Sequence, residues 1–130
     1  MLLDTSFLID LMNGDGKAVA RARTLEAERV DVRIPTPALF ELWRGVHLAT
    51  RSAEEAARVG LLLAAYGTAP LDGPSAARGG EVDAMLLRGR TPIDPEDSMI
   101  AGIALTRGEP LLTRNAKDFS RIPGLQVEVY

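Results

Sequence analysis

Residues 94–119 read DPEDSMIAGIALTRGEPLLTRNAKDF, and this stretch predicts a helix followed directly by a buried strand. Asp94 and Pro95 are residue types that begin a helix, and Gly108 is of the type that ends one. The apolar residues between them recur at helical spacing. Residues 110–113, PLLT, then form a short apolar run typical of a strand.

The same alternation of short apolar runs and longer helical stretches extends over the whole chain. Strands are predicted at residues 1–3, 30–34, 69–71, 110–113 and 125–130. Thr5 or Ser6 is expected to cap the first helix, and Thr36 to cap the helix that begins at Pro37. Further helices are predicted to begin at Lys17, Ser52, Pro74 or Ser75, and Pro95, and residues 115–119 form a turn or a short helix. This order predicts an α/β fold in three layers, with a short, mostly parallel central sheet covered by helices. The length favours a single domain over residues 1–130.

The composition restricts the chemistry that the chain can perform. Its 130 residues include no Cys and one His, His47, and the formal net charge is −3. Disulfides, thiolate zinc sites, Cys nucleophiles and sites built from several histidines are therefore excluded. The mild negative charge disfavours tight DNA binding through a broad basic face. If the protein is an enzyme, carboxylates, with or without a metal, must do most of the work.

The N-terminal residues carry no sign of export. They are apolar but lack a basic leader, and no apolar run approaches the roughly 20 residues that a membrane-spanning helix needs. We therefore expect a cytoplasmic protein with no membrane partner.

Four polar residues follow predicted strands or lie at helix starts that face the strand ends. They are Asp4, Glu41, Asp97 and Asn115. Ligands of open parallel sheets bind outside the carboxyl ends of the strands, so we expect these side chains to gather there. Several acids with no base nearby require a cation or shared protons. Hard oxygen ligands in this number suit Mg²⁺ or Mn²⁺.

Each of these residues also has a purely structural interpretation. Asp4 could cap the first helix, and Glu41 lies off the apolar stripe of its helix and could be a solvated surface residue. Asp97 occupies the third helical position, where a capping box places its acid, although it is also aligned with the buried stripe. Asn115 could be a turn residue. Spacing alone leaves these alternatives open.

Basic residues flank two of the candidate positions. Arg44 lies on the same predicted helix as Glu41, and Arg114 and Lys117 lie on either side of Asn115. Such residues could hold the phosphates of a nucleic acid. A solvated surface role is equally compatible with their density.

Three segments together resemble the PIN-domain ribonucleases, and most closely their toxin branch, the VapC-like proteins of type II toxin–antitoxin pairs. They are LLDTSFLIDL at residues 2–11, PTPALFELWRG at 35–45 and the closing segment 94–130. The combination of an Asp before Ile-Ala, an LLTxNxxDF run and a GLxV strand is the most specific part. The resemblance extends over the whole chain, and the middle is its least distinctive part.

The resemblance implies a fold of the PIN type and a metal-dependent endoribonuclease. By position, Asp4, Glu41 and Asp97 look like the three family acids that hold Mg²⁺ or Mn²⁺, and Asn115 stands where many relatives have a fourth acid. Supporting roles are implied for Thr5, Ser6, Thr113 and Asp118. The resemblance further implies an RNA substrate such as a tRNA or rRNA loop, a cognate antitoxin that blocks the pocket, and a homodimer that could enter a larger complex with it.

Two other functions are compatible with the same residues. Asp4 could be a covalent phosphate acceptor in a phosphoryl-transfer protein, although Ser6 stands where the second Asp of a DxDxT motif would lie. The chain could also be a non-catalytic module that binds RNA or a protein, and the uncharged Asn115 is the one hint in that direction.

Overall fold

Five short parallel strands form the centre of the protein, which is described over residues 1–130 by a computed structural model. Their order across the sheet is β3-β2-β1-β4-β5. The strands are β1 (Leu2–Leu3), β2 (Arg33–Pro35), β3 (Gly67–Ala69), β4 (Leu111–Leu112) and β5 (Val127–Glu128). All four neighbouring pairs are parallel, which confirms the predicted type of sheet.

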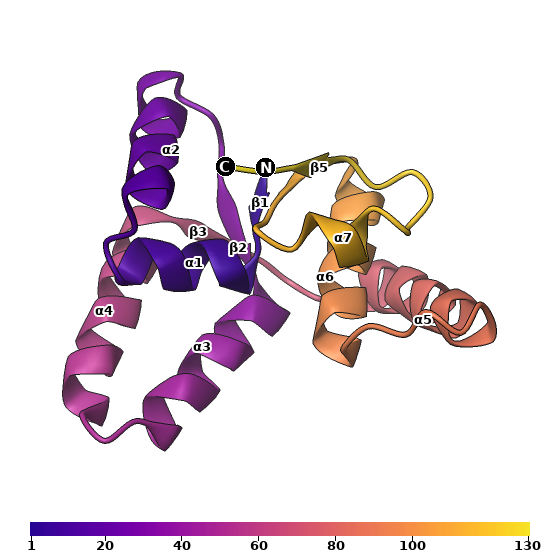
Figure 1. Cartoon of the computed structure of the whole chain (residues 1–130), viewed down its shortest axis with the longest axis horizontal. Coiled ribbons are helices and arrows are strands. Elements are labelled where there is room, and N and C mark those ends of the chain that lie inside the picture. Colours follow the sequence, from indigo (N-terminus) through magenta and orange to yellow (C-terminus); the bar gives the residue numbers. More distant parts are fainter.

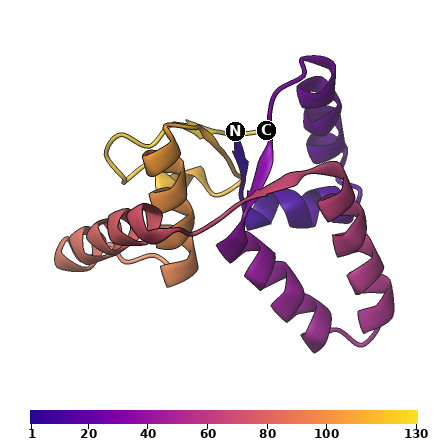
Figure 2. The ribbon, with the colours of Figure 1, turned by 180° about the vertical axis from the view of Figure 1, so that it is seen from behind.

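Seven helices cover this sheet. They are α1 (Thr5–Met12), α2 (Gly16–Ala27), α3 (Thr36–Leu48), α4 (Ser52–Ala65), α5 (Gly73–Arg88), α6 (Pro95–Arg107) and α7 (Ala116–Phe119). Figure 1 shows α1 to α4 on one side of the strands and α5, α6 and α7 on the other, and Figure 2 shows the same division from behind. The predicted three-layer α/β/α arrangement is confirmed. None of the helices is both long and apolar enough to cross a lipid bilayer.

The strand order places a switch point between β1 and β4. The chain runs from β1 outward to β2 and β3, then returns across β1 to place β4 and β5 on its other side. Connections that leave neighbouring strands in opposite directions open a crevice at the carboxyl ends of those strands. Asp4 directly follows β1 and Thr113 directly follows β4, so both lie at this crevice.

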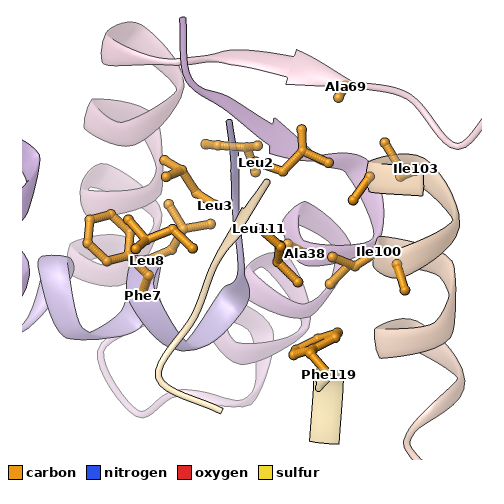
Figure 3. Close-up of a cluster of buried hydrophobic side chains, with 14 of the residues drawn as sticks. Leu2, Leu3, Phe7, Leu8, Ala38, Ala69, Ile100, Ile103, Leu111 and Phe119 are labelled. Carbon is orange, nitrogen blue, oxygen red and sulfur yellow. The ribbon is translucent and has the colours of Figure 1, made fainter. Parts of the chain in front are cut away.

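The core forms around the two central strands. Leu2, Leu3, Leu111 and Leu112 are fully buried, and Figure 3 shows three of them among the surrounding apolar side chains. These strands are covered by helices on both faces, which is why they read as continuous apolar runs instead of alternating ones. Burial of each such leucine stabilises the fold by about 1.5–3 kcal/mol relative to exposure.

Several predicted boundaries are wrong, and local hydrogen bonds explain some of the differences. The second strand begins at Arg33 instead of residue 30, the third lies at residues 67–69 instead of 69–71, and the last is confined to residues 127–128. Thr36 does not cap its helix. Its Oγ1 accepts a hydrogen bond from the backbone N–H of Leu71 at 3.0 Å and so ties the loop after β3 to α3.

The cap of α1 and the starts of α2 and α5 also differ from the sequence-based prediction. Neither Thr5 nor Ser6 caps α1, since Asp4 occupies the cap position without making a side-chain cap bond. Helix α2 begins at Gly16, with Asp15 accepting from the N–H of Ala18. Helix α5 begins at Gly73, because Asp72 accepts from the N–H of Ser75 at 2.9 Å.

Helices α5 and α6 approach each other so closely that their contact leaves no room for a side chain. A Cβ atom at Gly102 would lie 2.5 Å from the carbonyl oxygen of Ser75 and 2.6 Å from the backbone nitrogen of Gly79. Both partner atoms belong to the backbone, so neither can rotate away. Helix α6 carries Asp97 in its first turn, and the glycine contact therefore helps to set where that carboxylate lies.

We expect Gly102→Ala to lower the free energy of unfolding by about 1–3 kcal/mol or more, because the extra methyl group forces the helices apart. Urea denaturation measures this change. Gly60→Ala on α4 is the matched control, since no atom lies within 4 Å of its added Cβ. The control should raise stability by about 0.5–1 kcal/mol through helix propensity. Equal behaviour of the two variants would show that the helices do not depend on the close contact.

Candidate active site

A cleft of about 370 Å³ opens at the switch point, and all four predicted site residues line it. Asp4 enters from the end of β1, Glu41 from α3, Asp97 from the first turn of α6, and Asn115 from the turn after β4. The complete lining is Asp4, Thr5, Ser6, Ile9, Glu41, Asp94, Asp97, Arg114 and Asn115. Residues far apart in the chain thus meet where the strand ends predicted they would.

Asp4 is the most deeply buried acid of the cleft, with 3% of its surface exposed. Its Oδ2 accepts hydrogen bonds from Ser6 Oγ and Thr113 Oγ1, each at 2.7 Å. Its Oδ1 is buried and has no hydrogen-bond partner in the protein. A buried carboxylate oxygen without a partner is costly, so this atom requires a ligand. Asp4 occupies the cap position of α1, but its carboxylate makes no cap bond and is used in the cleft instead.

The two hydroxyl groups beside Asp4 also hold the loop that follows β4. Ser6 Oγ accepts from the N–H of Arg114 at 3.1 Å, and Thr113 Oγ1 accepts from the N–H of Asn115 at 2.8 Å. Each hydroxyl therefore donates to the acid and accepts from the backbone of the loop after β4. This arrangement fixes the orientation of the Asp4 carboxylate relative to the loop.

Glu41 is half-buried in the middle of α3 and is oriented by Thr5. Its Oε1 accepts from Thr5 Oγ1 at 2.8 Å, while Oε2 lies 3.9 Å from a guanidinium nitrogen of Arg44. Burial raises the pKa of the Glu41 carboxyl, the Thr5 hydrogen bond opposes this, and the charge of Asp4 adds to the increase. Glu41 is therefore not a freely solvated surface residue.

Asp97 is the acid whose protonation the cleft perturbs most. Burial, followed by the nearby carboxylates of Asp4 and Glu41, raises the pKa of Asp97 to about 7. Smaller contributions come from Asp94 and Asp118. Negative charge thus accumulates in the cleft without a compensating cation beside Asp97, which is the condition under which an acid holds its proton or binds a metal.

Asn115 and Asp118 form a pair at the edge of the cleft. The Asn115 amide donates from Nδ2 to Asp118 Oδ2 at 2.9 Å, and Asp118 also lies 3.6 Å from Arg121. Asn115 lines the cleft, whereas Asp118 does not. The hydrogen bond orients the amide so that its oxygen is the group left for another ligand.

The predicted basic residues differ in their relation to the cleft. Arg114 lines it, and Arg44 lies at its rim, 3.9 Å from both Glu41 and Glu96 and 5.5 Å above the ring of Phe40. Lys117 is exposed on α7 and does not line the cleft. Arg114 is therefore the one cationic side chain in the lining.

Sequence reasoning missed two acids near the site. Asp94 lines the cleft but was interpreted only as a helix cap, and its carboxylate makes no cap bond. Asp10 accepts from Arg114 and from the hydroxyl of Tyr130. The absence of a polar partner for Asp94 could not be read from the sequence. The pair of Asp10 and Tyr130 spans 120 positions and leaves no local pattern.

The residues of the cleft fit a divalent cation with water in part of its shell. No three acidic or histidine side chains converge closely enough to enclose an ion by themselves. The partnerless Oδ1 of Asp4 and the mutual repulsion of Asp4, Glu41 and Asp97 nevertheless favour a cation between them. Mg²⁺ usually keeps several waters and binds through one or two carboxylates, so this donor set is adequate.

Comparison with known proteins agrees with this architecture. The sequence profile of the PIN domain family matches residues 1–125. The tRNA(fMet)-specific endonuclease VapC of Salmonella typhimurium is 30% identical over 127 residues, which cover 98% of this chain and 95% of that protein.

Two solved structures share the fold over nearly their whole length. A DNA-bound VapBC complex from Salmonella typhimurium contains a chain that superimposes with a TM-score of 0.89 at 29% identity, covering 98% of this chain and 96% of that one. VapBC2 from Rickettsia felis, bound to a promoter DNA fragment, gives a TM-score of 0.91 at 23% identity, covering 99% and 97%. At that identity the second likeness concerns the fold alone.

Asp97→Asn should stabilise the metal-free protein at pH 8 and change its stability little near pH 4. The folded-state pKa of about 7 lies above the usual value of 3.8 for an Asp side chain. The protonated form therefore loses its advantage as the pH rises through this window, and the ionised acid destabilises the wild type above it. The substitution removes that penalty. Urea unfolding in EDTA at pH 4, 6 and 8 measures it.

Glu28→Gln is the control for this comparison. Glu28 is exposed at the end of α2 and forms no ion pair. Its substitution should leave the pH profile of the wild type unchanged. A stability difference between Asp97→Asn and wild type that is constant from pH 4 to pH 8 would contradict the electrostatic account of the cleft.

Proposed function

Because this chain belongs to the PIN domain family, with a VapC endonuclease among its relatives, we propose that it is an endoribonuclease toxin of a type II toxin–antitoxin pair. The observation that carries the proposal is the convergence of Asp4, Glu41 and Asp97 on one cleft, with a buried carboxylate oxygen left without a partner. The substrate is RNA, and loops of structured RNA such as tRNA or rRNA are the class that the relatives suggest.

We propose that Asp4, Glu41 and Asp97 hold Mg²⁺ or Mn²⁺, directly or through water. Such an ion lowers the pKa of water and stabilises the charge that develops on a phosphoryl group. Asp4 presents its free Oδ1 while Ser6 and Thr113 hold its Oδ2 in place. Asp97 gives up its proton when a cation binds, because the cation offsets the repulsion that raises its pKa.

Glu41 is proposed to orient the attacking water and to accept its proton. Thr5 holds one of its oxygens, and its raised pKa brings it closer to the range of an efficient general base. Asn115 turns its amide oxygen toward the cleft under the control of Asp118 and can bind a water or the substrate. With an amide in place of a fourth acid, the cleft is suited to one tightly held ion.

RNA phosphates are proposed to contact Arg114 inside the cleft and Arg44 at its rim, with a weaker contribution from the exposed Lys117. We further propose that the protein forms a homodimer and binds a cognate antitoxin protein, and that the two assemble into a larger complex. The DNA-bound VapBC complex from Salmonella typhimurium, whose matching chain is 29% identical to this one, supports a complex of that kind here.

We expect discrete cleavage of a labelled total RNA pool by the wild type with Mg²⁺ or Mn²⁺, and none in EDTA. Asp97→Asn and Asp4→Asn should lower the cleavage rate on the order of 10²-fold or more, because each removes a carboxylate from the reacting centre. Glu28→Gln is the control, since Glu28 is exposed at the end of α2 and does not line the cleft. Full activity of either Asp variant would refute the proposed site.

Binding of Mn²⁺ tests the site without reference to catalysis. Isothermal titration should show binding to the wild type and a loss of about tenfold or more in affinity for Asp4→Asn and for Asp97→Asn. Circular dichroism verifies that the variants are folded. A folded wild type that binds no Mn²⁺ would favour the non-catalytic module, and a covalent adduct after incubation with acetyl phosphate would favour Asp4 as a phosphate acceptor.

A further inference from the structure

A chain of hydrogen bonds runs from the last residue of the sequence to the one cation in the acidic cleft. The guanidinium of Arg114 donates from Nη1 to Asp10 Oδ1 at 2.5 Å. The other oxygen of Asp10, Oδ2, accepts from the hydroxyl of Tyr130 at 2.6 Å. The three residues come from α1, from the turn after β4 and from the segment after β5, so only the folded protein brings them together.

Asp10 is held firmly at both oxygens. Its side chain is 15% exposed, and the ring of Tyr130 packs edge-on against the fully buried Phe7, with centroids 5.0 Å apart. Burial, and then the hydrogen bond to Asp10, raises the pKa of Tyr130, so its hydroxyl stays protonated at neutral pH and keeps donating. Asp10 is thus a rigid acceptor in place of a freely moving surface acid.

Arg114 remains open to a ligand although it is paired. Its side chain is 62% exposed, and its ion pair with Asp10 uses a single nitrogen, Nη1. A guanidinium has five N–H donors in a fixed fork, so those on Nη2 and Nε are left for another acceptor. The side chain is therefore oriented without being fully occupied.

The backbone of Arg114 is linked to Asp4 through the hydroxyl of Ser6. Its N–H donates to Ser6 Oγ at 3.1 Å, and that hydroxyl donates in turn to Asp4 Oδ2. The guanidinium and the partnerless oxygen of Asp4 are consequently held by one set of bonds. Hydrogen bonds therefore hold both the backbone and the guanidinium of Arg114 in place at the cleft.

Four carboxylates line the cleft with this single cation, and they repel any phosphate that enters. A guanidinium recognises phosphate oxygens in bidentate geometry, and a pre-oriented one loses little freedom on binding. We propose that Arg114 binds a non-bridging oxygen of an RNA phosphate at the cleft, and that Asp10 and Tyr130 are positioning residues that orient its guanidinium. This inference rests on the proposed ribonuclease function and adds two residues to its binding step.

The test is a double-mutant cycle on RNA binding. Affinities are measured in EDTA, where no cleavage is expected, with a fluorescein-labelled 20-nucleotide single-stranded RNA of mixed sequence. Arg114→Ala should weaken binding about tenfold and Tyr130→Phe about threefold, in line with the loss of charge-assisted hydrogen bonds. The double variant should bind no more weakly than Arg114→Ala alone, because Tyr130 acts only through Arg114.

A second measurement separates binding from chemistry. In single-turnover cleavage with Mn²⁺, Tyr130→Phe should raise the protein concentration at half-maximal rate about threefold and leave the maximal rate within about twofold of wild type. Asp10→Asn should behave in the same way, since the amide cannot form the ion pair. Tyr66→Phe, which removes a hydroxyl from a separate pocket between α2 and the end of α4, is the control and should change neither quantity.

Each outcome bears on the inference directly. An equal loss from Tyr130→Phe in the wild-type and Arg114→Ala backgrounds would assign Tyr130 a structural role only and overturn the inference. So would an unchanged affinity in Tyr130→Phe, and in both cases wild-type cleavage would leave the ribonuclease function standing. A folded wild type that neither binds nor cleaves RNA would overturn the proposed function and this inference together.

Discussion

The carboxylate of Asp4 is buried at the switch point of the sheet with one oxygen bonded twice and the other not at all. The first oxygen fixes the acid, since Ser6 and Thr113 reach it from opposite walls. The second creates a demand for positive charge that the protein itself does not meet. The same excess of negative charge affects Glu41 and Asp97, because the charge of Asp4 contributes to the raised pKa of each.

Two short buried strands are enough to place these polar side chains at the crevice. Two strands of two residues each, buried on both faces, end side by side, and the next residue along each chain segment is polar. Hydrophobic burial of the leucines holds the strand ends in place, while Asp4 and Thr113 extend from them into the crevice. On each strand, the buried leucine that stabilises the core is therefore followed directly by the polar residue that belongs to the site.

The sequence was informative where a residue's place followed from a nearby strand or helix end. Asp4, Asp97 and Asn115 were located by such ends, and the crevice rule for parallel sheets brought them together with Glu41. The sequence was less informative where tertiary contacts override the local preference of a residue. Thr36 looks like a cap but bonds to Leu71, and Asp94 looks like a cap but faces the cleft. The bond between Asp10 and Tyr130 joins residues with no local relationship at all.

The close contact between α5 and α6 depends on the absence of a side chain at Gly102. At Gly102 any other amino acid introduces a Cβ against backbone that cannot yield. The position of Asp97 thus depends on Gly102, a residue of the same helix that does not line the cleft. Any side chain at position 102 meets this backbone, so one substitution in a lineage can disturb the site while all of its acids are still encoded. In such a lineage, intact acids alone are a poor guide to a working copy.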